Sequence, residues 1–184
     1  HSRIERMSTL AKSRAVLVQK DGGTWVATGD HIRRVAKRVT AEERKGKAVV
    51  VVVSAMGKTT DELIALSTEL TGKPAKREMD MLLHAGEIIS ASLLAIAIEE
   101  EGESAVSLTG SQAGMITNET HMQARIEQVE GDRILRHLTK GRVVVIAGFQ
   151  GVSRQNEITT LGRGGSDTSA VAFAVGIGAG QCER

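Results

Sequence analysis

The sequence predicts an α/β fold in which a mostly parallel sheet has helices on both of its faces, giving three layers. The first indication is two unbroken runs of aliphatic residues, Ala48–Val53 (AVVVVV) and Val143–Ala147 (VVVIA). Such runs are typical of strands that are buried on both faces. The second indication is that segments with apolar residues at helical spacing lie between the expected strands. Strands that alternate with helices favour a parallel sheet covered on both sides.

Each expected element follows from its local pattern. Residues 31–39 (HIRRVAKRV) carry apolar residues at helical spacing and basic residues on the other face, which is typical of a surface helix. A long helical pattern begins after the only proline, Pro74. In chain order we expect a strand at 15–19, a helix at 31–39, a strand at 48–53, a helix capped by Asp61, a long helix at about 76–99, a strand at 105–108, a helix at 132–140, a strand at 143–147 and a last helix from near Ser166.

The length of 184 residues fits a single domain with a substantial core. No internal repeat or low-complexity linker divides the chain. Residues 1–14 are expected to be a tag or a disordered N-terminus, with Met7 as the natural start. Residues 15–184 are expected to form the domain.

The composition argues against several classes of function. The 24 basic and 22 acidic residues give a formal net charge of +2, and Trp25, Phe149 and Phe173 are the only aromatic residues, so no nucleic-acid partner is expected. The single cysteine, Cys182, excludes an intramolecular disulfide and a zinc site built from cysteines, and it suits a reducing cytosol. No apolar run reaches the roughly 20 residues that span a bilayer. We therefore expect a cytoplasmic protein with no membrane contact.

Glycine-rich segments follow four of the expected strands, at residues 20–24, 54–60, 109–114 and 148–166. In a parallel sheet, ligands bind in the loops beyond the carboxyl ends of the strands. The sequence therefore predicts a binding site at that edge. No group of His, Asp and Glu has metal-ligand spacing, so no metal site built by the protein is expected, and His121 is expected in a loop or at the surface.

The segment LGRGGSDTSAVAFAVG, residues 161–176, combines glycines with both charges at the start of a helical pattern. Main-chain amides at a helix N-terminus bind anions, and Arg163 would add a charge-assisted contact. Asp167 would repel an anion unless it orients an ammonium group or helps to hold a metal. The segment therefore indicates a substrate that carries both charges, or a phosphate that arrives with its metal ion.

Three other segments have two readings each. Lys20 with Gly22 and Gly23 (KDGGT) could hold a phosphate or could form a tight turn with a solvated lysine. Residues 54–63 (SAMGKTTDEL) could contact a ligand or could be an ordinary loop that leads into a helix. Glu87 could lie on the polar face of its long helix, or the small residues Ala-Gly before it could let a ligand approach.

Taken together and in order, these segments resemble the aspartokinases of the amino acid kinase family. The resemblance extends over about residues 16–183, nearly the whole chain. It is carried by VQKDGGTWVA, VVVSAMGKTTDEL, REMDMLLHAGEIISASLLA, SLTGSQAGMIT with the following His121 and residues 124–126, and VIAGFQGVSRQNEITTLGRGGSDTSAVA.

The resemblance implies ATP-dependent phosphorylation of the β-carboxylate of L-aspartate to 4-phospho-L-aspartate, with Mg²⁺. This reaction leads to lysine, threonine and methionine. The physics of the substrate agrees with the residue types, because an amino acid needs an acid for its ammonium and a guanidinium for a carboxylate. Phosphoryl transfer needs mainly positioning and charge neutralisation from the protein.

The resemblance also implies a role for each matching residue. Lys20 would be catalytic and would bind and neutralise the transferring phosphoryl group, while Asp167 would order the reacting centre. Glu87 matches the acid that binds the aspartate ammonium, and Arg163 matches the clamp on its α-carboxylate. The remaining matches are Gly22, Gly23 and Ser54 beside the phosphates of ATP, and Thr60, Phe149, Gly164, Gly165 and Ser166 around the substrate.

The sequence departs from the family at three points, of which the mildest is HAGE (residues 84–87) where the family usually reads Thr-Gly-Glu or Ala-Gly-Glu, a change that keeps Glu87. Asp21 stands where the family carries Phe or Tyr, and Trp25 stands where it carries a small serine. The family continues beyond the position of Arg184 into a nucleotide-binding half and regulatory domains. We therefore expect a portion truncated before the nucleotide-binding half, with an exposed sheet edge that a second copy or a completing subunit covers.

Two alternatives to the kinase reading stay open. The first is a truncated paralogue with weak or no catalysis that acts as an amino-acid-binding or scaffold subunit. The second is a kinase of another small carboxylate or amino acid on the same fold.

Overall fold

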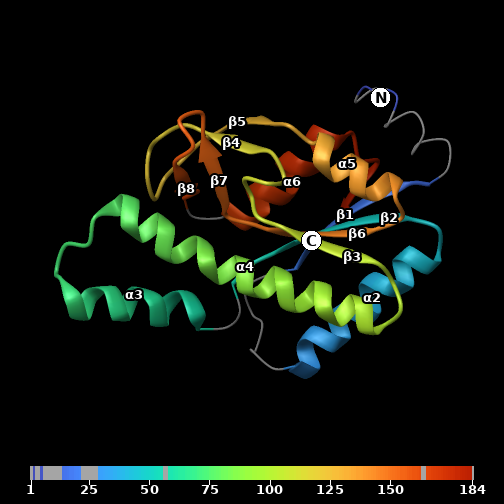
Figure 1. Ribbon diagram of the computed structural model, residues 1–184, viewed down its shortest axis with the longest axis horizontal. Coiled ribbons are helices and arrows are strands. Elements are labelled where there is room, and N and C mark those ends of the chain that lie inside the picture. Colours follow the sequence, from blue (N-terminus) through green and yellow to red (C-terminus); the bar gives the residue numbers. More distant parts are fainter. Residues whose placement is uncertain are drawn as a thin grey trace.

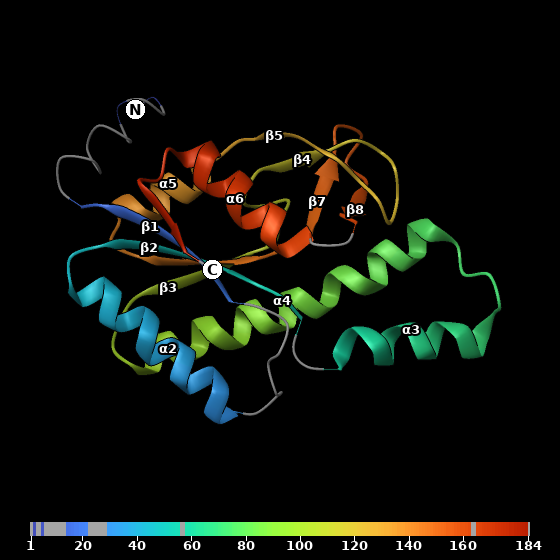
Figure 2. The ribbon, with the colours of Figure 1, turned by 180° about the vertical axis from the view of Figure 1, so that it is seen from behind.

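The computed structural model describes residues 2, 5, 14–21, 29–55, 58–162 and 165–183, and for Asp21, Ser166 and Gln181 it describes the main chain only. Within these residues the chain forms two sheets and five helices (Figures 1 and 2).

The larger sheet is the parallel sheet that the aliphatic runs predict. Its strands are β1 (Val16–Asp21), β2 (Ala48–Val53), β3 (Ala105–Leu108), β6 (Val143–Ala147) and β9 (Gln181–Glu183), in the order β3-β6-β2-β1-β9. Every neighbouring pair is parallel. All residues of β2 and β6 are buried, because helices cover both faces of the sheet. The expected fold class is confirmed.

The helices lie on opposite faces of this sheet (Figure 1). One layer holds α2 (Gly29–Arg44) and α4 (Lys76–Glu100), and the other holds α5 (Asp132–Thr139) and α6 (Gly165–Ile177). The strand period of two produces this arrangement, since alternate valines of β2 face opposite sides. Val50 and Val52 pack in the cluster that contains Phe173 of α6, whereas Val49 and Val51 pack in the cluster of α2 and α4.

A smaller sheet was not predicted. It contains β4 (Met115–Thr117), β5 (Ile126–Val129), β7 (Gln150–Ser153) and β8 (Ile158–Thr160), in the order β5-β4-β7-β8. The β4–β5 and β7–β8 pairs are antiparallel, and the β4–β7 pair is parallel. Sequences such as QGVS and ITT are too short and too polar to be recognised as strands by periodicity. Part of the expected loop at 148–166 is therefore a hairpin.

Two local expectations need correction. The strand β1 continues through Asp21, so Lys20 lies inside the strand and pairs with Val52, and it does not lie in a loop after the strand. The helix α3 (Thr59–Leu70) begins two residues before Asp61, and its N-cap residue is Lys58. Asp61 lies in the first turn, where its charge still interacts favourably with the helix dipole.

The long helix α4 is apolar as well as long, and by these two measures alone it could cross a membrane. A helix in the core of a soluble protein can have the same length and apolar composition. Here α4 packs against β3 and β6, and it buries both Asp80 and Glu87. The apolar side chains on its sheet-facing side, among them Ala91, Leu94 and Ile98, belong to the core. The helix α3 lies beside α4 as an antiparallel partner (Figure 2).

Among the described residues, Phe173 is the largest fully buried side chain and is 0% exposed, whereas Val175 on the same helix is 77% exposed. We predict that Phe173→Ala lowers the free energy of unfolding by about 3–5 kcal/mol, because it removes apolar contacts and leaves a cavity. Val175→Ala, the matched control, should change it by less than about 0.5 kcal/mol. Urea unfolding measures both, and equal losses in the two variants would contradict this core.

Candidate functional site

Several of the predicted site residues that the structure describes lie where the parallel strands end. Lys20 lies near the end of β1, Ala55 follows β2, and Phe149 follows β6. The main-chain N–H of Gly148 donates to the carbonyl oxygen of Val53 at 2.9 Å, which ties the end of β6 to the end of β2. This edge of the main sheet therefore carries the candidate site.

Lys20 and Asp167 form an ion pair at this edge. The Lys20 Nζ lies 3.0 Å from Oδ1 of Asp167, and the two side chains are 19% and 43% exposed. Asp167 is in the first turn of α6, where a negative charge interacts favourably with the helix dipole. A partly exposed pair of this kind contributes at most about 1 kcal/mol. Lys20 can therefore exchange this partner for an anionic ligand at small cost.

Glu87 is a buried acid on α4. Its side chain is 4% exposed, and burial raises its pKa from 4.5 to about 7, although hydrogen bonds from the main chain of Ala55 and of Glu87 itself lower it in part. The preceding Gly86 allows close approach, since a Cβ there would lie 3.1 Å from Cβ of Ala55. The Glu87 carboxyl thus faces the end of β2.

One carboxyl oxygen of Glu87 lacks a partner. Oε2 is buried and accepts no hydrogen bond from any residue that the structure describes. Buried polar atoms are nearly always hydrogen-bonded, so such an oxygen calls for an explanation. Together with the raised pKa, it indicates a functional group that receives a cation or a proton donor.

Phe149 has an unusual main chain that is fixed on both sides. Its φ is +68°, in the left-handed region that a bulky residue rarely adopts. Its N–H donates to Oγ of the buried Ser169 at 3.1 Å, and its carbonyl oxygen accepts from the N–H of Leu161 at 2.8 Å. A Cβ on Gly165 would lie 2.7 Å from Cδ2 of the Phe149 ring. The ring therefore packs against the first residue of α6, and Gly165 must remain a glycine.

The other predicted residues divide into two groups. Ser54 directly follows β2 and precedes Ala55, whose main chain contacts Glu87, whereas Thr60 lies in the first turn of α3. Of Ser166 the structure gives only the main chain, in the first turn of α6. Gly22, Gly23, Arg163 and Gly164, and also Trp25, lie outside the described residues.

Sequence reasoning missed a second buried acid, Asp80. It lies seven residues before Glu87, hence on the same face of α4, and this spacing was the available signal. His121 lies in a loop, as expected, but its Nδ1 is 2.6 Å from Oδ2 of Asp80 and its side chain is only 20% exposed. His121 is therefore half-buried and bonded to the buried acid.

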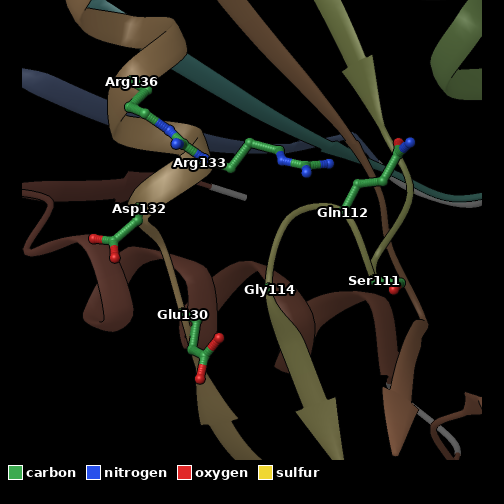
Figure 3. A pocket seen from close by; sticks show the side chains of 7 residues that line it. All are labelled: Ser111, Gln112, Gly114, Glu130, Asp132, Arg133 and Arg136. Atoms are coloured by element: carbon green, nitrogen blue, oxygen red, sulfur yellow. The ribbon is translucent and has the colours of Figure 1, made fainter. Parts of the chain in front are cut away.

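A separate pocket of about 340 Å³ lies between the β3–β4 turn and the start of α5 (Figure 3). Arg133 extends toward Gln112, while Asp132 points away from it. Two acids and two arginines line this pocket, so its charge is balanced, and none of its residues was predicted as a site residue. Its lining is Ser111, Gln112, Gly114, Glu130, Asp132, Arg133 and Arg136. Among the described residues, no group of three or more His, Cys, Asp or Glu could hold a metal ion.

Comparison with known families identifies the fold. Residues 15–183 match the amino acid kinase family. The chain belongs to this family. The match begins one residue before β1 and ends with β9, so it includes the whole main sheet and the candidate site.

Curated proteins that are similar to this chain include aspartokinases. The chain is 55% identical over 168 residues to an aspartokinase of Geobacillus stearothermophilus, an alignment that covers 91% of this chain and 41% of the relative. It is also 55% identical over 170 residues to an aspartokinase of Mycobacterium bovis, with 92% and 40% coverage. The resemblance seen in the sequence is confirmed, and the chain spans about 41% of the length of such relatives.

Solved structures agree. The aspartate kinase of Synechocystis matches with a TM-score of 0.76 and 47% identity, covering 91% of this chain and 28% of that one. Aspartokinase III of E. coli, in complex with aspartate and ADP, matches with a TM-score of 0.80 and 24% identity, covering 91% and 48%. The second likeness supports the fold alone, because the identity is low.

The raised pKa of Glu87 predicts a pH dependence of stability. Between pH 4.5 and about 7 the folded protein holds a proton on Glu87 that the unfolded chain has released. Stability should therefore fall as pH rises through this window, by roughly 3 kcal/mol from this group. Glu87→Gln should remove this part of the slope. Urea unfolding of both proteins from pH 4.5 to 8 measures it, and parallel stability curves would contradict the assignment.

Proposed function

We propose that residues 15–184 are the substrate-binding portion of an aspartokinase, which phosphorylates the β-carboxylate of L-aspartate with ATP to give 4-phospho-L-aspartate. The observation that carries this proposal is the buried Oε2 of Glu87, which has no partner among the described residues, at the same sheet edge as the Lys20–Asp167 pair. An ammonium group supplies the missing hydrogen bond and the positive charge that such an oxygen needs. The 55% identity to aspartokinases supports the same substrate.

The substrate would be held at both ends by opposite charges. Glu87 receives the ammonium group, and Arg163 receives the α-carboxylate in the bidentate geometry that guanidinium groups favour. Phe149 and the main chain at the start of α6 close the space between them, with Gly164, Gly165 and Ser166. Thr60, in the first turn of the helix that follows β2, would also contact the substrate. This arrangement orients the β-carboxylate toward Lys20.

The transfer itself needs charge neutralisation and alignment. A β-carboxylate oxygen attacks the γ-phosphorus of ATP, the bond to the bridging oxygen breaks, and its electron pair leaves with ADP. Lys20 exchanges part of its contact with Asp167 for the phosphoryl oxygens, while Gly22, Gly23 and Ser54 contact the phosphates. Mg²⁺, bound with ATP, would share the neutralisation of charge, and Asp167 is the carboxylate beside Lys20 that could contact it.

Assembly and location follow from the same proposal. We propose that the chain associates with a second copy or a completing subunit. Exposed apolar side chains support this association: Leu66 and Leu70 on α3, and Ile89 and Ile96 on α4. We further propose that it acts in the cytoplasm, on the route to lysine, threonine and methionine.

The second candidate is an amino-acid-binding subunit without catalysis. Asp21 favours it, because an acid directly after Lys20 would repel phosphate. The two candidates share the binding of L-aspartate and differ in turnover.

Calorimetric titration with L-aspartate tests the binding site. Because ammonium binding favours the charged form of Glu87, affinity should rise as pH increases through about 7, and binding at pH 7 should release about half a proton. Buffers of different ionisation enthalpy measure this proton. Glu87→Gln should weaken binding at least about tenfold and abolish the release. Glu99→Gln, an exposed residue on the same helix, is the control. No heat in the folded wild-type chain would overturn the site.

Lys20→Met tests the transfer step. We expect kcat with L-aspartate and Mg-ATP to fall by about 10²–10³, since a charge that stabilises the transferring group is lost. Affinity for L-aspartate should stay within about twofold. Lys37→Met on the exposed face of α2 is the control. An assay of ADP formation measures the rate. A wild-type chain that binds aspartate but forms no ADP would favour the binding subunit.

A further inference from the structure

Asp80 is a fully buried acid with four hydrogen bonds that the proposed chemistry does not use. It is 0% exposed. Its Oδ1 accepts from Oγ1 of Thr160 at 2.6 Å and from the N–H of Met122 at 3.1 Å. Its Oδ2 accepts from Nδ1 of His121 at 2.6 Å and from the same N–H at 3.2 Å. A buried carboxylate with this many donors holds its surroundings firmly.

The donors come from two segments of the smaller sheet. His121 and Met122 belong to the loop between β4 and β5, and Thr160 is the last residue of β8. The carbonyl oxygen of Thr160 also accepts from the N–H of Ala124 at 3.0 Å, so the loop and the strand are tied to each other. Met122 has a φ of +67°, a conformation that persists only when its surroundings fix it.

A chain of contacts leads from Asp80 to the ion pair at the site. Leu161 follows Thr160 and donates its N–H to the carbonyl oxygen of Phe149 at 2.8 Å. A Cβ on Gly165 would lie 2.9 Å from Cβ of Leu161, so the two residues are in close contact. Gly165 begins α6, and Asp167, two residues later, pairs with Lys20.

In the other direction, Asp80 is rigidly connected to Glu87. Both are buried on the same face of α4, seven residues apart, which is about 10 Å along the helix axis. Asp80 therefore joins the helix that carries the ammonium receptor to the strand that leads into α6.

We propose that Asp80 is a positioning residue, which fixes the spacing between Glu87 and the Lys20–Asp167 pair. The inference rests on the proposed function, because the spacing matters when one small substrate must reach both sides. Asp80 does not touch the substrate; it holds β8, and through Leu161 and Phe149 it holds the start of α6. L-Aspartate contacts both α4 and α6, so its binding depends on this spacing, whereas the phosphates of ATP contact the Lys20 side alone.

The first test compares two ligands in two variants. In Asp80→Asn an amide N–H₂ replaces one acceptor and faces the donors, and in Thr160→Val one hydrogen bond is removed without a change on α4. We expect Asp80→Asn to weaken L-aspartate binding about tenfold or more, and Thr160→Val to weaken it severalfold. The Kd of Mg-ATP should change less than about twofold in both. If Asp80→Asn does not fold, the L-aspartate Kd of Thr160→Val alone tests the proposal.

A control separates positioning from general loss of stability. Leu135→Ala, in α5 on the face of the main sheet that lies away from α4, should lower the unfolding free energy at least as much as Thr160→Val. It should leave the L-aspartate Kd unchanged. Folded Asp80 and Thr160 variants with the wild-type Kd for L-aspartate would overturn the proposal, as would an equal loss for both ligands.

Hydrogen exchange gives a readout that does not need the substrate. In Asp80→Asn the amides of Ala124, Leu161 and Gly165 should exchange faster, while the amide of Gly148, which bonds to Val53 in the main sheet, should not. If the wild-type chain binds no L-aspartate, the proposed function fails. The exchange rates still test whether Asp80 holds β8 and the start of α6 in place. Unchanged exchange at the three amides would overturn the connection itself.

Discussion

Two carboxyl groups are buried on one face of α4. The rest of the site depends on the difference in their hydrogen bonding. Asp80 accepts four hydrogen bonds from the smaller sheet. Glu87 keeps one buried oxygen without a partner among the described residues, and its pKa is raised to about 7. Burial of a charge is costly unless it is paired. Asp80 therefore joins α4 to the smaller sheet, whereas one oxygen of Glu87 can still accept a hydrogen bond.

The main sheet brings the remaining groups to this helix. Because β1, β2 and β6 are parallel and adjacent, their carboxyl ends meet at one edge. The register of β1 on β2 pairs Lys20 with Val52, and α6 returns Asp167 to within 3.0 Å of Lys20. Tight packing of Phe149 against Gly165 fixes where α6 begins. Lys20 and Asp167, from distant parts of the chain, are thus held together at this edge by a core of aliphatic side chains.

The main sheet and its helices could be predicted because their signals are local and strong. Continuous valines specify β2 and β6, and helical spacing specifies α2 and α4. The smaller sheet could not be predicted, since strands of only three or four residues of mixed polarity are too short to show a periodicity. The hydrogen bonds of Asp80 to His121 and Thr160 join residues that are 41 and 80 positions apart in the sequence. No local sequence pattern can therefore predict them. The family resemblance singled out Lys20, Glu87 and Asp167, and the roles of these residues and of Arg163 stay predictions.

The central claim is that the Glu87 carboxyl binds the ammonium group of the substrate. Titration of this carboxyl tests the claim most directly. Carbon-13 NMR of the glutamate side-chain carboxyls, assigned by loss of one signal in Glu87→Gln, follows this group alone. We predict a midpoint near pH 7 in the ligand-free protein, and a midpoint well below that on saturation with L-aspartate. A midpoint near 4.5 without ligand, or one that saturating L-aspartate leaves unchanged, would contradict the account.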